Sequence, residues 1–368
     1  MSGMMAGMLS LVLLWSGSTL AACDWPAWQH FRQAYISEQG RVIDPAGGRD
    51  ITTSEGQSYG MFFALVADDR DTFAQLLQWT QNNLAAGDMT ARLPAWLWGQ
   101  DQQQQWGVLD PNSAADSDLW LAYDLLEAGR LWHNRRYLML GTLLLQRIAR
   151  EEVANIPGLG VMLLPGKNGF VEEQRWTLNP SYLPPQLLAR FAAFEGPWLA
   201  MRHSNQRLLL EAAPSGLLPD WVVWQPKEGW LPDPKTGSIG SYDAIRSYLW
   251  VGMLADDATD RASLTAHLQP MVELTATLGV PPERVDVLTG KAFGSGSVGF
   301  SAALLPLLQQ TSAAEVQRRR LAAQPVGEQS YYDAVLTLFG QGWDQRRYAF
   351  NQAGELVPGW GNSCSSYR

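Results

Sequence analysis

Apolar residues recur along the chain at spacings of three and four, the period of an α-helix, and Gly and Pro residues separate the periodic segments. Alternation with the period of a β-strand is confined to short pieces such as 221–224. The pattern predicts an all-α protein with about twelve helices. They are expected near residues 26–38, 56–67, 71–86, 116–132, 135–150, 182–195, 196–212, 242–255, 260–278, 297–309, 313–322 and 328–340.

The predicted helices alternate between two kinds of pattern. Even-numbered helices are apolar or small on nearly every side, as in GQSYGMFFALVA (56–67), which is typical of a helix buried all round. Odd-numbered helices carry one apolar stripe and one polar face, as in DTFAQLLQWTQNNLA (71–85), which is typical of an outer layer. We therefore expect six inner helices inside six outer ones. In such a double ring the N-termini of all inner helices open on one rim, where we expect the chemistry.

The chain begins with an apolar run that ends in small residues, 1–22, and this run is too short to be a stable membrane span. We interpret it as a cleaved signal peptide. The remaining residues, 23–368, contain no later membrane-spanning run, no charge run and no flexible linker. They are expected to form a single domain.

Charge and metal-ligating residues argue against two classes of function. The formal net charge of −9 and the pI near 5.0 disfavour a nucleic-acid partner. The four histidines are scattered without the spacing of metal ligands, and two cysteines cannot form a metal site alone. We therefore expect neither a metal ion nor a cofactor.

The two cysteines, Cys23 and Cys364, lie at the two ends of the expected mature chain. An oxidising compartment would allow them to form a disulfide that ties the termini together. Cys23 also ends the sequence LAAC, which matches the pattern for lipid attachment. A membrane-attached lipoprotein is therefore the alternative to the disulfide.

Tryptophan is unusually frequent, with 17 residues against 11 each of Phe and Tyr. A large helical core accounts for most of them. Trp96 and Trp98 differ because they lie in loop-like sequence, where a flat aromatic face can stack on a sugar ring. They are our candidates for stacking platforms, although Trp98 fits core packing equally well.

Three acidic residues occupy equivalent places, each in the first turn of an even-numbered helix: Glu55, Asp116 and Asp243. Acids in first turns complement the helix dipole, so each of them alone has a structural explanation. Their surroundings, TTSEGQSYG and GSIGSYDAIR, are rich in Gly, Ser and Tyr rather than in charged residues. This composition favours a cleft.

Serine residues at cap spacing precede the acids, namely Ser54 with Gln57, Ser113 with Asp116, and Ser241 with Asp243.

Hydrolysis of a glycosidic bond needs one protonated carboxyl as acid and one ionised carboxylate as base or nucleophile. Arg246 follows Asp243 by three residues on the same helical face and favours its charged form, so Asp243 is the better base. Glu55 has no basic neighbour in sequence and is followed by apolar and aromatic residues. Burial or the neighbouring Asp116 would have to outweigh the helix dipole for Glu55 to act as the acid.

Several longer motifs carry a resemblance to a known family. The chain resembles glycoside hydrolase family 8, and within it the periplasmic endoglucanases encoded with bacterial cellulose synthases. The resemblance runs through nearly the whole mature chain. It rests on CDWPAW, RVIDP, ITTSEGQSYGMFFAL, LPAWLWG, VLDPNSAADSDLW, EAGRLW, MLLPGK, NPSYLPP, PDWV, SYDAIR and LTLFGQGWD.

The resemblance implies an (α/α)6 barrel formed by one catalytic domain, an inverting mechanism and cellulose as substrate. By motif, it places Glu55 at the acid position, Asp243 at the base position and Asp116 in contact with the distorted sugar. It also implies that Tyr59, Tyr182 and Arg246 contact the substrate. The chain departs from the family pattern on both sides of Asp116, where it has Ala115 and Ser117, and local hydrogen bonding there is expected to differ.

The resemblance further implies a periplasmic protein whose partner is a β-1,4-glucan chain, with a functional association with the cellulose synthase complex. Two other functions stay open. One is a non-catalytic glucan-binding or scaffold protein of the export machinery, and the other is a chitosanase of the same family.

Overall fold

The computed structural model describes residues 25–45, 48–327 and 329–360. The expected signal peptide at 1–22 and both Cys23 and Cys364 lie outside the described residues. The signal peptide and the pairing of the two cysteines therefore stay predictions, which a mass measurement of the mature protein can test.

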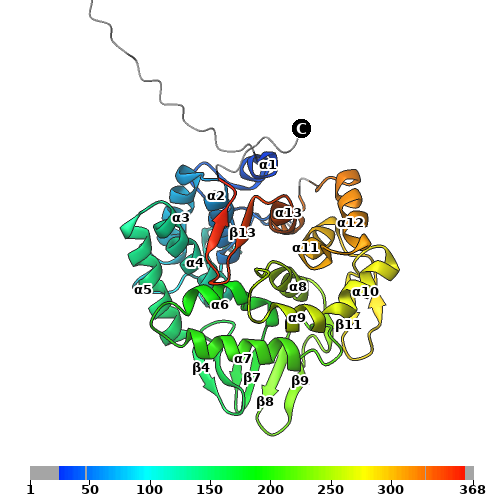
Figure 1. The fold of residues 1–368 in the computed structure, drawn as a ribbon. Helices are drawn as coiled ribbons and strands as arrows, with labels where there is room; N and C mark the ends of the chain where they lie inside the picture. The colour runs from blue at the N-terminus through cyan, green and yellow to red at the C-terminus, as the bar shows by residue number, and fades with distance from the viewer. Residues whose placement is uncertain (1–24, 46–47, 328, 361–368) are drawn as a thin grey trace, which may run out of the picture.

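Two concentric layers of helices make up the body of the protein (Figure 1). The inner helices are α2 (Ser54–Val66), α4 (Ala115–Leu131), α6 (Pro185–Phe191), α8 (Ala244–Gly252), α11 (Val298–Leu308) and α13 (Tyr331–Asp344). The outer helices are α1 (Pro26–Tyr35), α3 (Arg70–Leu84), α5 (Arg135–Glu151), α7 (Trp198–Glu211), α9 (Arg261–His267), α10 (Gln269–Leu278) and α12 (Ser312–Ala323). The protein is an (α/α)6 barrel, as predicted.

The inner ring closes through contacts between successive helices. α2, α4, α6, α8, α11 and α13 contact one another in that order. Phe62 on α2 stacks on Phe339 of α13 with ring centroids 5.3 Å apart, which joins the last inner helix to the first. Every residue of α8 is buried, as the pattern of the even-numbered segments predicted.

Two elements differ from the predicted helices, and proline explains both. The segment 260–278 forms two helices, α9 and α10, because Pro270 cannot donate the hydrogen bond that would continue the helix. Helix α6 begins only at Pro185, after the short 3-10 helix η2 (Pro180–Tyr182). The residue before a proline is disfavoured in helical conformation, so the pair Pro184 and Pro185 delays the start of the helix.

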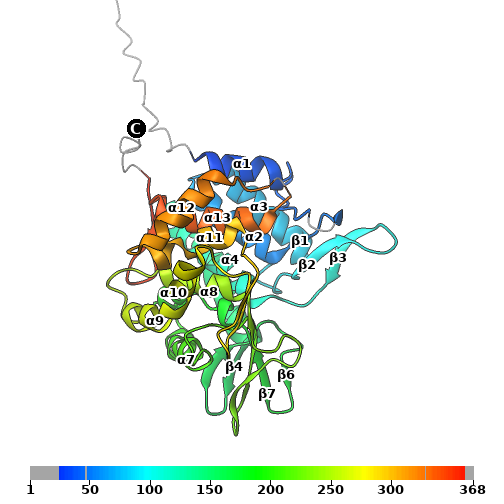
Figure 2. The ribbon, with the colours of Figure 1, turned by 90° about the vertical axis from the view of Figure 1, so that its right-hand side faces the viewer.

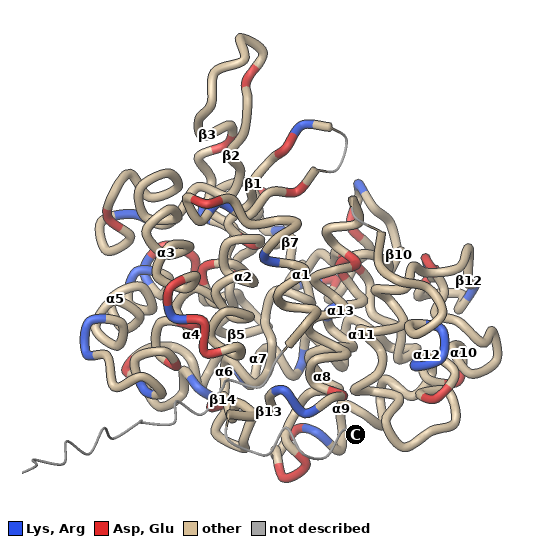
Figure 3. Tube along the Cα trace, turned by 90° about the horizontal axis from the view of Figure 1, so that it is seen from above, with Lys and Arg blue, Asp and Glu red and all other residues tan. Residues whose placement is uncertain are grey.

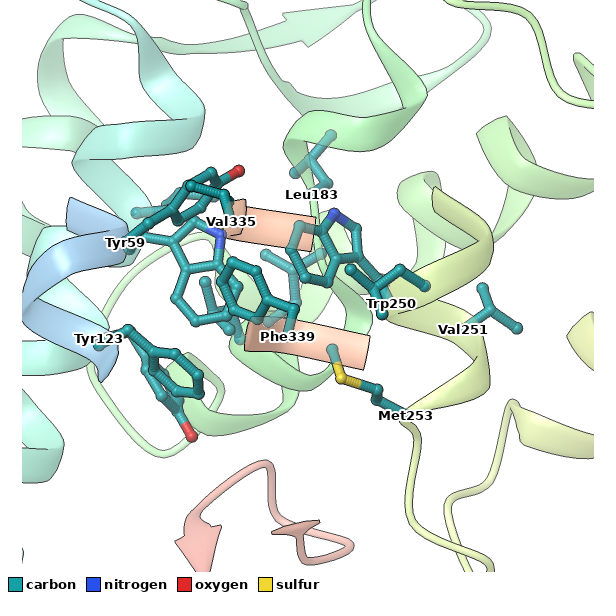
Figure 4. Close-up of a cluster of buried hydrophobic side chains, with 14 of the residues drawn as sticks. Tyr59, Tyr123, Leu183, Trp250, Val251, Met253, Val335 and Phe339 are labelled. Atoms are coloured by element: carbon teal, nitrogen blue, oxygen red, sulfur yellow. The ribbon is translucent and has the colours of Figure 1, made fainter. Parts of the chain in front are cut away.

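Aromatic side chains fill the centre of the barrel (Figure 4). Phe339 packs against Tyr59, Trp120 and Trp250, with ring centroids 5.0, 5.4 and 5.1 Å away. Trp120, Trp250 and Trp198 are among the largest fully buried side chains. Core packing thus explains part of the high tryptophan content.

Short strands occupy the connections between helices. They are β1 (Thr52–Thr53), β2 (Leu97–Gln100), β3 (Trp106–Asp110), β4 (Val153–Ile156), β5 (Gly160–Leu163), β6 (Val171–Glu172), β7 (Arg175–Leu178), β8 (Val222–Gln225), β9 (Gly229–Pro232), β10 (Ile239–Gly240), β11 (Arg284–Asp286), β12 (Ala292–Phe293), β13 (Tyr348–Phe350) and β14 (Leu356–Pro358). All their pairings are antiparallel.

Most of these strands build one rim of the barrel. β1, β3, β10 and β12 each precede the N-terminus of an inner helix, and η2 precedes α6. The β2–β3 hairpin and the sheet that contains β6 and β7 extend well beyond the helices (Figure 2). The rim that carries the N-termini of the inner helices therefore has walls of short strands. Within the described ranges, no helix is long and apolar enough to cross a membrane.

Candidate active site

The three acids predicted from the sequence lie on the same rim of the barrel. Glu55 is in the first turn of α2, Asp116 is in the first turn of α4, and Asp243 is the N-cap residue of α8. Arg246 connects two of them, because its guanidinium forms an ion pair with Glu55 and another, at 2.8 Å, with Oδ1 of Asp243. Asp116 lies beside Glu55, whose charge acts on it. Three carboxyl groups and one guanidinium thus form a single cluster.

Arg246 corrects one expectation about the charges. The sequence paired Arg246 with Asp243 and gave Glu55 no basic neighbour nearby along the chain. The structure shows one buried guanidinium in contact with both carboxylates, and Nη2 also donates to Oγ of Ser181 at 3.1 Å. The different roles of the two acids therefore cannot come from Arg246.

Asp116 supplies the asymmetry instead. Its side chain is buried, and burial together with the charge of Glu55 raises the pKa of Asp116 well above its usual range. The Asp116 carboxyl therefore keeps its proton to a higher pH than an exposed aspartate does. A protonated carboxyl beside Glu55 is an asymmetry of the kind that a general acid requires.

The capping predictions were wrong for all three helices. Thr53, rather than Ser54, is the N-cap of α2, and its Oγ1 accepts a hydrogen bond from the N–H of Gly56 at 3.0 Å. Ser54 is buried and shares a 2.6 Å hydrogen bond with Ser117. That bond ties the first turn of α2 to the first turn of α4. It uses the hydroxyl that the unusual Ser117 adds beside Asp116.

The other two serines also have partners outside their helices. Ser113 donates to the carboxylate of Glu152, and Ser241 donates to the carbonyl oxygen of Glu283 at 2.7 Å. Neither hydroxyl caps the helix that follows it. These serines are tertiary contacts that position the loops before α4 and α8.

Asp220 and Trp221 contact Asp243 and were missed by the sequence analysis. The indole Nε1 of Trp221 donates to Oδ2 of Asp243 at 3.0 Å. Oδ1 of Asp220 accepts from the backbone N–H of Asp243 at 3.1 Å. Burial and the charge of Asp243 raise the pKa of Asp220 to about 6. The signal was present only as the motif PDWV, which gives no spatial information.

A buried pair of acids lies behind the site and was also missed. Asp118 and Glu152 are both fully buried and lie close enough for each to act on the pKa of the other. Burial raises the pKa of Glu152 to about 8 and raises that of Asp118 well above its usual range. The two carboxyls therefore keep their protons to a higher pH than exposed carboxyls do.

The expected substrate tyrosines separate into two positions. Tyr182 is half-buried at the cluster. Its ring lies 5.9 Å from the guanidinium of Arg246 and 5.7 Å from the ring of Trp221. Tyr59 is only 1% exposed and packs against Trp120 in the core. So little exposed surface argues against direct contact between Tyr59 and a sugar. Burial raises the pKa of both phenols.

The two candidate stacking residues also differ in their surroundings. Trp98 packs against the rings of Trp79 and Trp106, 5.3 and 5.0 Å away, and against the guanidinium of Arg41. Its partner Trp106 is 48% exposed and is the more open ring of this stack. Trp96 is half-buried, and its carbonyl oxygen accepts from the N–H of Ser54 next to Glu55 at 3.0 Å. Stacking on a sugar stays a prediction for both candidates.

The cluster has the elements of a two-carboxyl hydrolytic site. The pair of Glu55 and Asp116 can give a proton, and Asp243 can accept one while Arg246 and Trp221 hold its two oxygens. No group of three or more His, Cys, Asp or Glu side chains within the described ranges is arranged to hold a metal ion.

Comparisons with known proteins place this site in a family. The sequence profile described as "Glycosyl hydrolases family 8" matches residues 1–346. A protein of Salmonella typhi named Endoglucanase is 57% identical over 369 residues, which cover 100% of both chains.

Solved structures agree with that match. The endo-1,4-D-glucanase from Vibrio fischeri is 48% identical and superposes with a TM-score of 0.87, covering 91% of this chain and 99% of that one. The endo-beta-1,4-glucanase CMCax from Acetobacter xylinum is 28% identical with a TM-score of 0.70, covering 86% and 95% of the two chains. Since the profile and the relatives span nearly the whole length, the chain belongs to glycosyl hydrolase family 8.

Proposed function

We propose that this protein is an exported endo-β-1,4-glucanase that hydrolyses cellulose chains with inversion at the anomeric carbon. The observation that carries the proposal is the bridge from Arg246 to both Glu55 and Asp243, with the buried Asp116 beside Glu55. The positive charge of Arg246 and the raised pKa of Asp116 allow three carboxyl groups to lie close together. Such surroundings can give carboxyls the different protonation states that an acid and a base require.

Glu55 acts as the general acid. It gives a proton to the leaving glycosidic oxygen, and the buried Asp116, whose pKa is raised, lies beside it. Once a glucan chain is bound, Asp116 is placed to contact the distorted sugar at the cleavage point. A substitution of Asp116 is therefore expected to affect both the sugar contact and proton donation by Glu55.

Asp243 acts as the general base. Arg246 donates to its Oδ1 and Trp221 to its Oδ2, so a donor holds each carboxylate oxygen. Each carboxylate oxygen accepts more than one hydrogen bond, so a water molecule can still bind. Asp243 takes a proton from that water molecule as the oxygen of the water attacks the anomeric carbon. The glycosidic oxygen leaves with the proton from Glu55.

Cellulose is the substrate that relatives and charge favour together. The Salmonella typhi relative is named Endoglucanase, and the Vibrio fischeri structure is described as an endo-1,4-D-glucanase. Lys and Arg positions are dispersed over the described part of the chain rather than gathered in one region (Figure 3). A neutral glucan fits such a surface. The acid cluster also suits a cationic chitosan chain, which keeps a chitosanase as the second candidate.

The location we propose is the periplasm. Residues 1–22 have the composition of a signal peptide, and export would allow Cys23 and Cys364 to form a disulfide. Lipid attachment at Cys23 is the competing outcome. In the periplasm the enzyme would act on the cellulose chain that leaves the synthase complex, which is the functional association we propose.

Rates on two polymers test this function. Purified protein is incubated with carboxymethyl cellulose and with chitosan, and new reducing ends are measured. A glucanase releases them from carboxymethyl cellulose at the higher rate. A higher rate on chitosan would identify a chitosanase, and binding of glucan without release of reducing ends would identify a scaffold protein.

A further inference from the structure

The first turn of α8 receives its cap from a distant part of the chain. Oδ1 of Asp220 accepts three backbone hydrogen bonds, from Ser241 at 2.7 Å, Asp243 at 3.1 Å and Ala244 at 2.7 Å. No side chain within α8 caps its N-terminus. The backbone that carries the Asp243 carboxylate is therefore fixed by one oxygen atom of Asp220.

The next residue fixes the carboxylate itself. Nε1 of Trp221 donates to Oδ2 of Asp243 at 3.0 Å, while Arg246 donates to Oδ1 at 2.8 Å. The indole is held in place by Phe170, whose ring is parallel to it within 2° at 6.0 Å. Tyr182 packs edge-on against the same indole at 5.7 Å. Rotation of the carboxylate would break a charge-assisted hydrogen bond at each oxygen.

Two adjacent residues thus hold the backbone and the side chain of the same acid. Their own loop is tied to the segment before α8, because the N–H of Asp220 donates to the carbonyl oxygen of Ile239 at 2.8 Å. A shift of this loop moves the backbone and the carboxylate of Asp243 together. Displacement of a reacting group by about 1 Å can cost about 10²-fold in rate.

We propose that Asp220 and Trp221 are positioning residues for the general base. Asp220 fixes the position of the Asp243 backbone at the start of α8. Trp221 fixes the orientation of the Asp243 carboxylate toward the attacking water. This proposal rests on the proposed role of Asp243. It assigns a catalytic effect to the PDWV motif, which the sequence analysis used only as a mark of resemblance.

A different role for Asp220 must be separated from this one. Its carboxyl lies near Asp243 and has a pKa of about 6, so it could itself accept a proton in the reaction. In Asp220→Asn, the side-chain amide oxygen can still accept the three backbone hydrogen bonds, but the amide cannot act as a general base. A positioning role tolerates Asn at this position, whereas a proton-transfer role does not.

The variants are chosen in matched pairs. Asp220→Ala removes the three backbone contacts, and its control is Asp233→Ala, which removes a loop carboxylate that accepts from the N–H groups of Lys235 and Thr236. Trp221→Phe keeps an aromatic ring but removes the indole N–H. Its control is Trp230→Phe, because the indole of Trp230 bonds to Glu211 on α7.

Two substrates separate the base from the acid. Values of kcat and KM are measured on a cello-oligosaccharide and on the matching β-cello-oligosyl fluoride, whose fluoride leaves without a proton. Defects on the base side reduce kcat on both substrates by the same factor, whereas Glu55→Gln recovers on the fluoride. Asp243→Asn is the reference for complete loss of the base, and thermal unfolding shows that each variant is folded.

We expect Asp220→Ala to lose on the order of 10²-fold in kcat and Trp221→Phe about tenfold, with KM changed little. Asp220→Asn should keep most of the activity, and the two control variants should resemble the wild type. If Asp220→Asn is as inactive as Asp243→Asn, Asp220 transfers a proton and the positioning role is wrong. Folded Asp220→Ala and Trp221→Phe with wild-type kcat, or with changes in KM alone, would also overturn it. An active Asp243→Asn would overturn the proposed function and this inference together.

Discussion

Arg246 on α8 forms an ion pair with Glu55 on α2, although 191 positions separate them in the sequence. The guanidinium is almost fully buried, and its contact with Asp243 makes it the only link that the two proposed catalytic carboxylates share in the described residues. Both the charge and the planar shape of the arginine are needed, since one group must reach two carboxylates at once.

Arg246→Lys keeps the charge but removes this bridge. An ammonium group is a single point donor, so one of the two carboxylates loses its partner. We expect kcat on carboxymethyl cellulose to fall at least about tenfold, the scale of one lost charged hydrogen bond. Arg202→Lys is the control, because Arg202 pairs with Asp260 on the outer layer. Equal activities in the two variants would show that the bridge has no catalytic effect.

The acid and the base can be removed one at a time. Glu55→Gln and Asp243→Asn preserve shape, so both variants should fold and should lose at least about 10²-fold in turnover. Reducing-sugar release measures turnover, and thermal unfolding checks the fold. The proposed roles would be abandoned if either folded variant kept near-native activity.

The helical architecture could be read from the sequence because its signal is local. The all-round apolar pattern of 56–67 and the one-sided pattern of 71–86 follow from where α2 and α3 lie in the double ring. Each pattern is complete within the sequence of its own helix. The same locality explains why the three acids were placed on the correct rim, since each begins an inner helix.

The partners of the site residues could not be read in this way. Ser54 was expected to cap its own helix, but it bonds to Ser117 across 63 positions. Asp220 precedes by 24 positions the helix whose first N–H it caps. No periodicity or spacing encodes such contacts, because they depend on how the loops of the rim meet in space. The short strands were missed for a related reason, since two-residue strands such as β1 and β10 depend on a pairing partner.

The buried pair of Asp118 and Glu152 predicts an unusual dependence of stability on pH. Burial raises the pKa of Glu152 from 4.5 to about 8, so the folded protein binds a proton that the unfolded chain releases. The stability gained from this proton is present in full below pH 4.5 and is lost as the pH rises through about 8.

Thermal unfolding at pH 6 and pH 9 tests this dependence. The melting temperature of the wild type should fall between these values by more than that of Glu152→Gln, whose amide cannot ionise. Glu151→Gln is a matched control, because Glu151 is partly exposed and pairs with Arg147 and Lys167. Parallel changes in the wild type and Glu152→Gln would show that the pair is not protonated in the folded state.

A disulfide between Cys23 and Cys364 should form in protein isolated from the periplasm. It would close a loop of nearly the whole mature chain, and the chain-entropy model gives about 6 kcal/mol for so long a loop. Intact-mass measurement before and after reduction and alkylation detects it. A diacylglycerol mass on Cys23 or a free Cys364 thiol would contradict the pairing.

The stereochemical outcome tests the roles of both acids. If Asp243 activates a water molecule, that water must fit between its carboxylate and the anomeric carbon. The carboxyls of Glu55 and Asp243 should then stand roughly 6.5–9.5 Å apart in the substrate complex, whereas a nucleophile needs about 5–5.5 Å. The two acids begin different inner helices, α2 and α8, and the guanidinium of Arg246 lies between them, which favours the wider separation.

Inversion makes the α-anomer the first product from a β-linked cello-oligosaccharide. Proton NMR in the first minutes of the reaction, before mutarotation, distinguishes the two anomers by the signal of the new reducing end. Asp220→Asn should give the same anomer as the wild type, because positioning the base does not change which atom attacks. A β-anomer at the start would mean retention, and Asp243 would then be a nucleophile rather than a base.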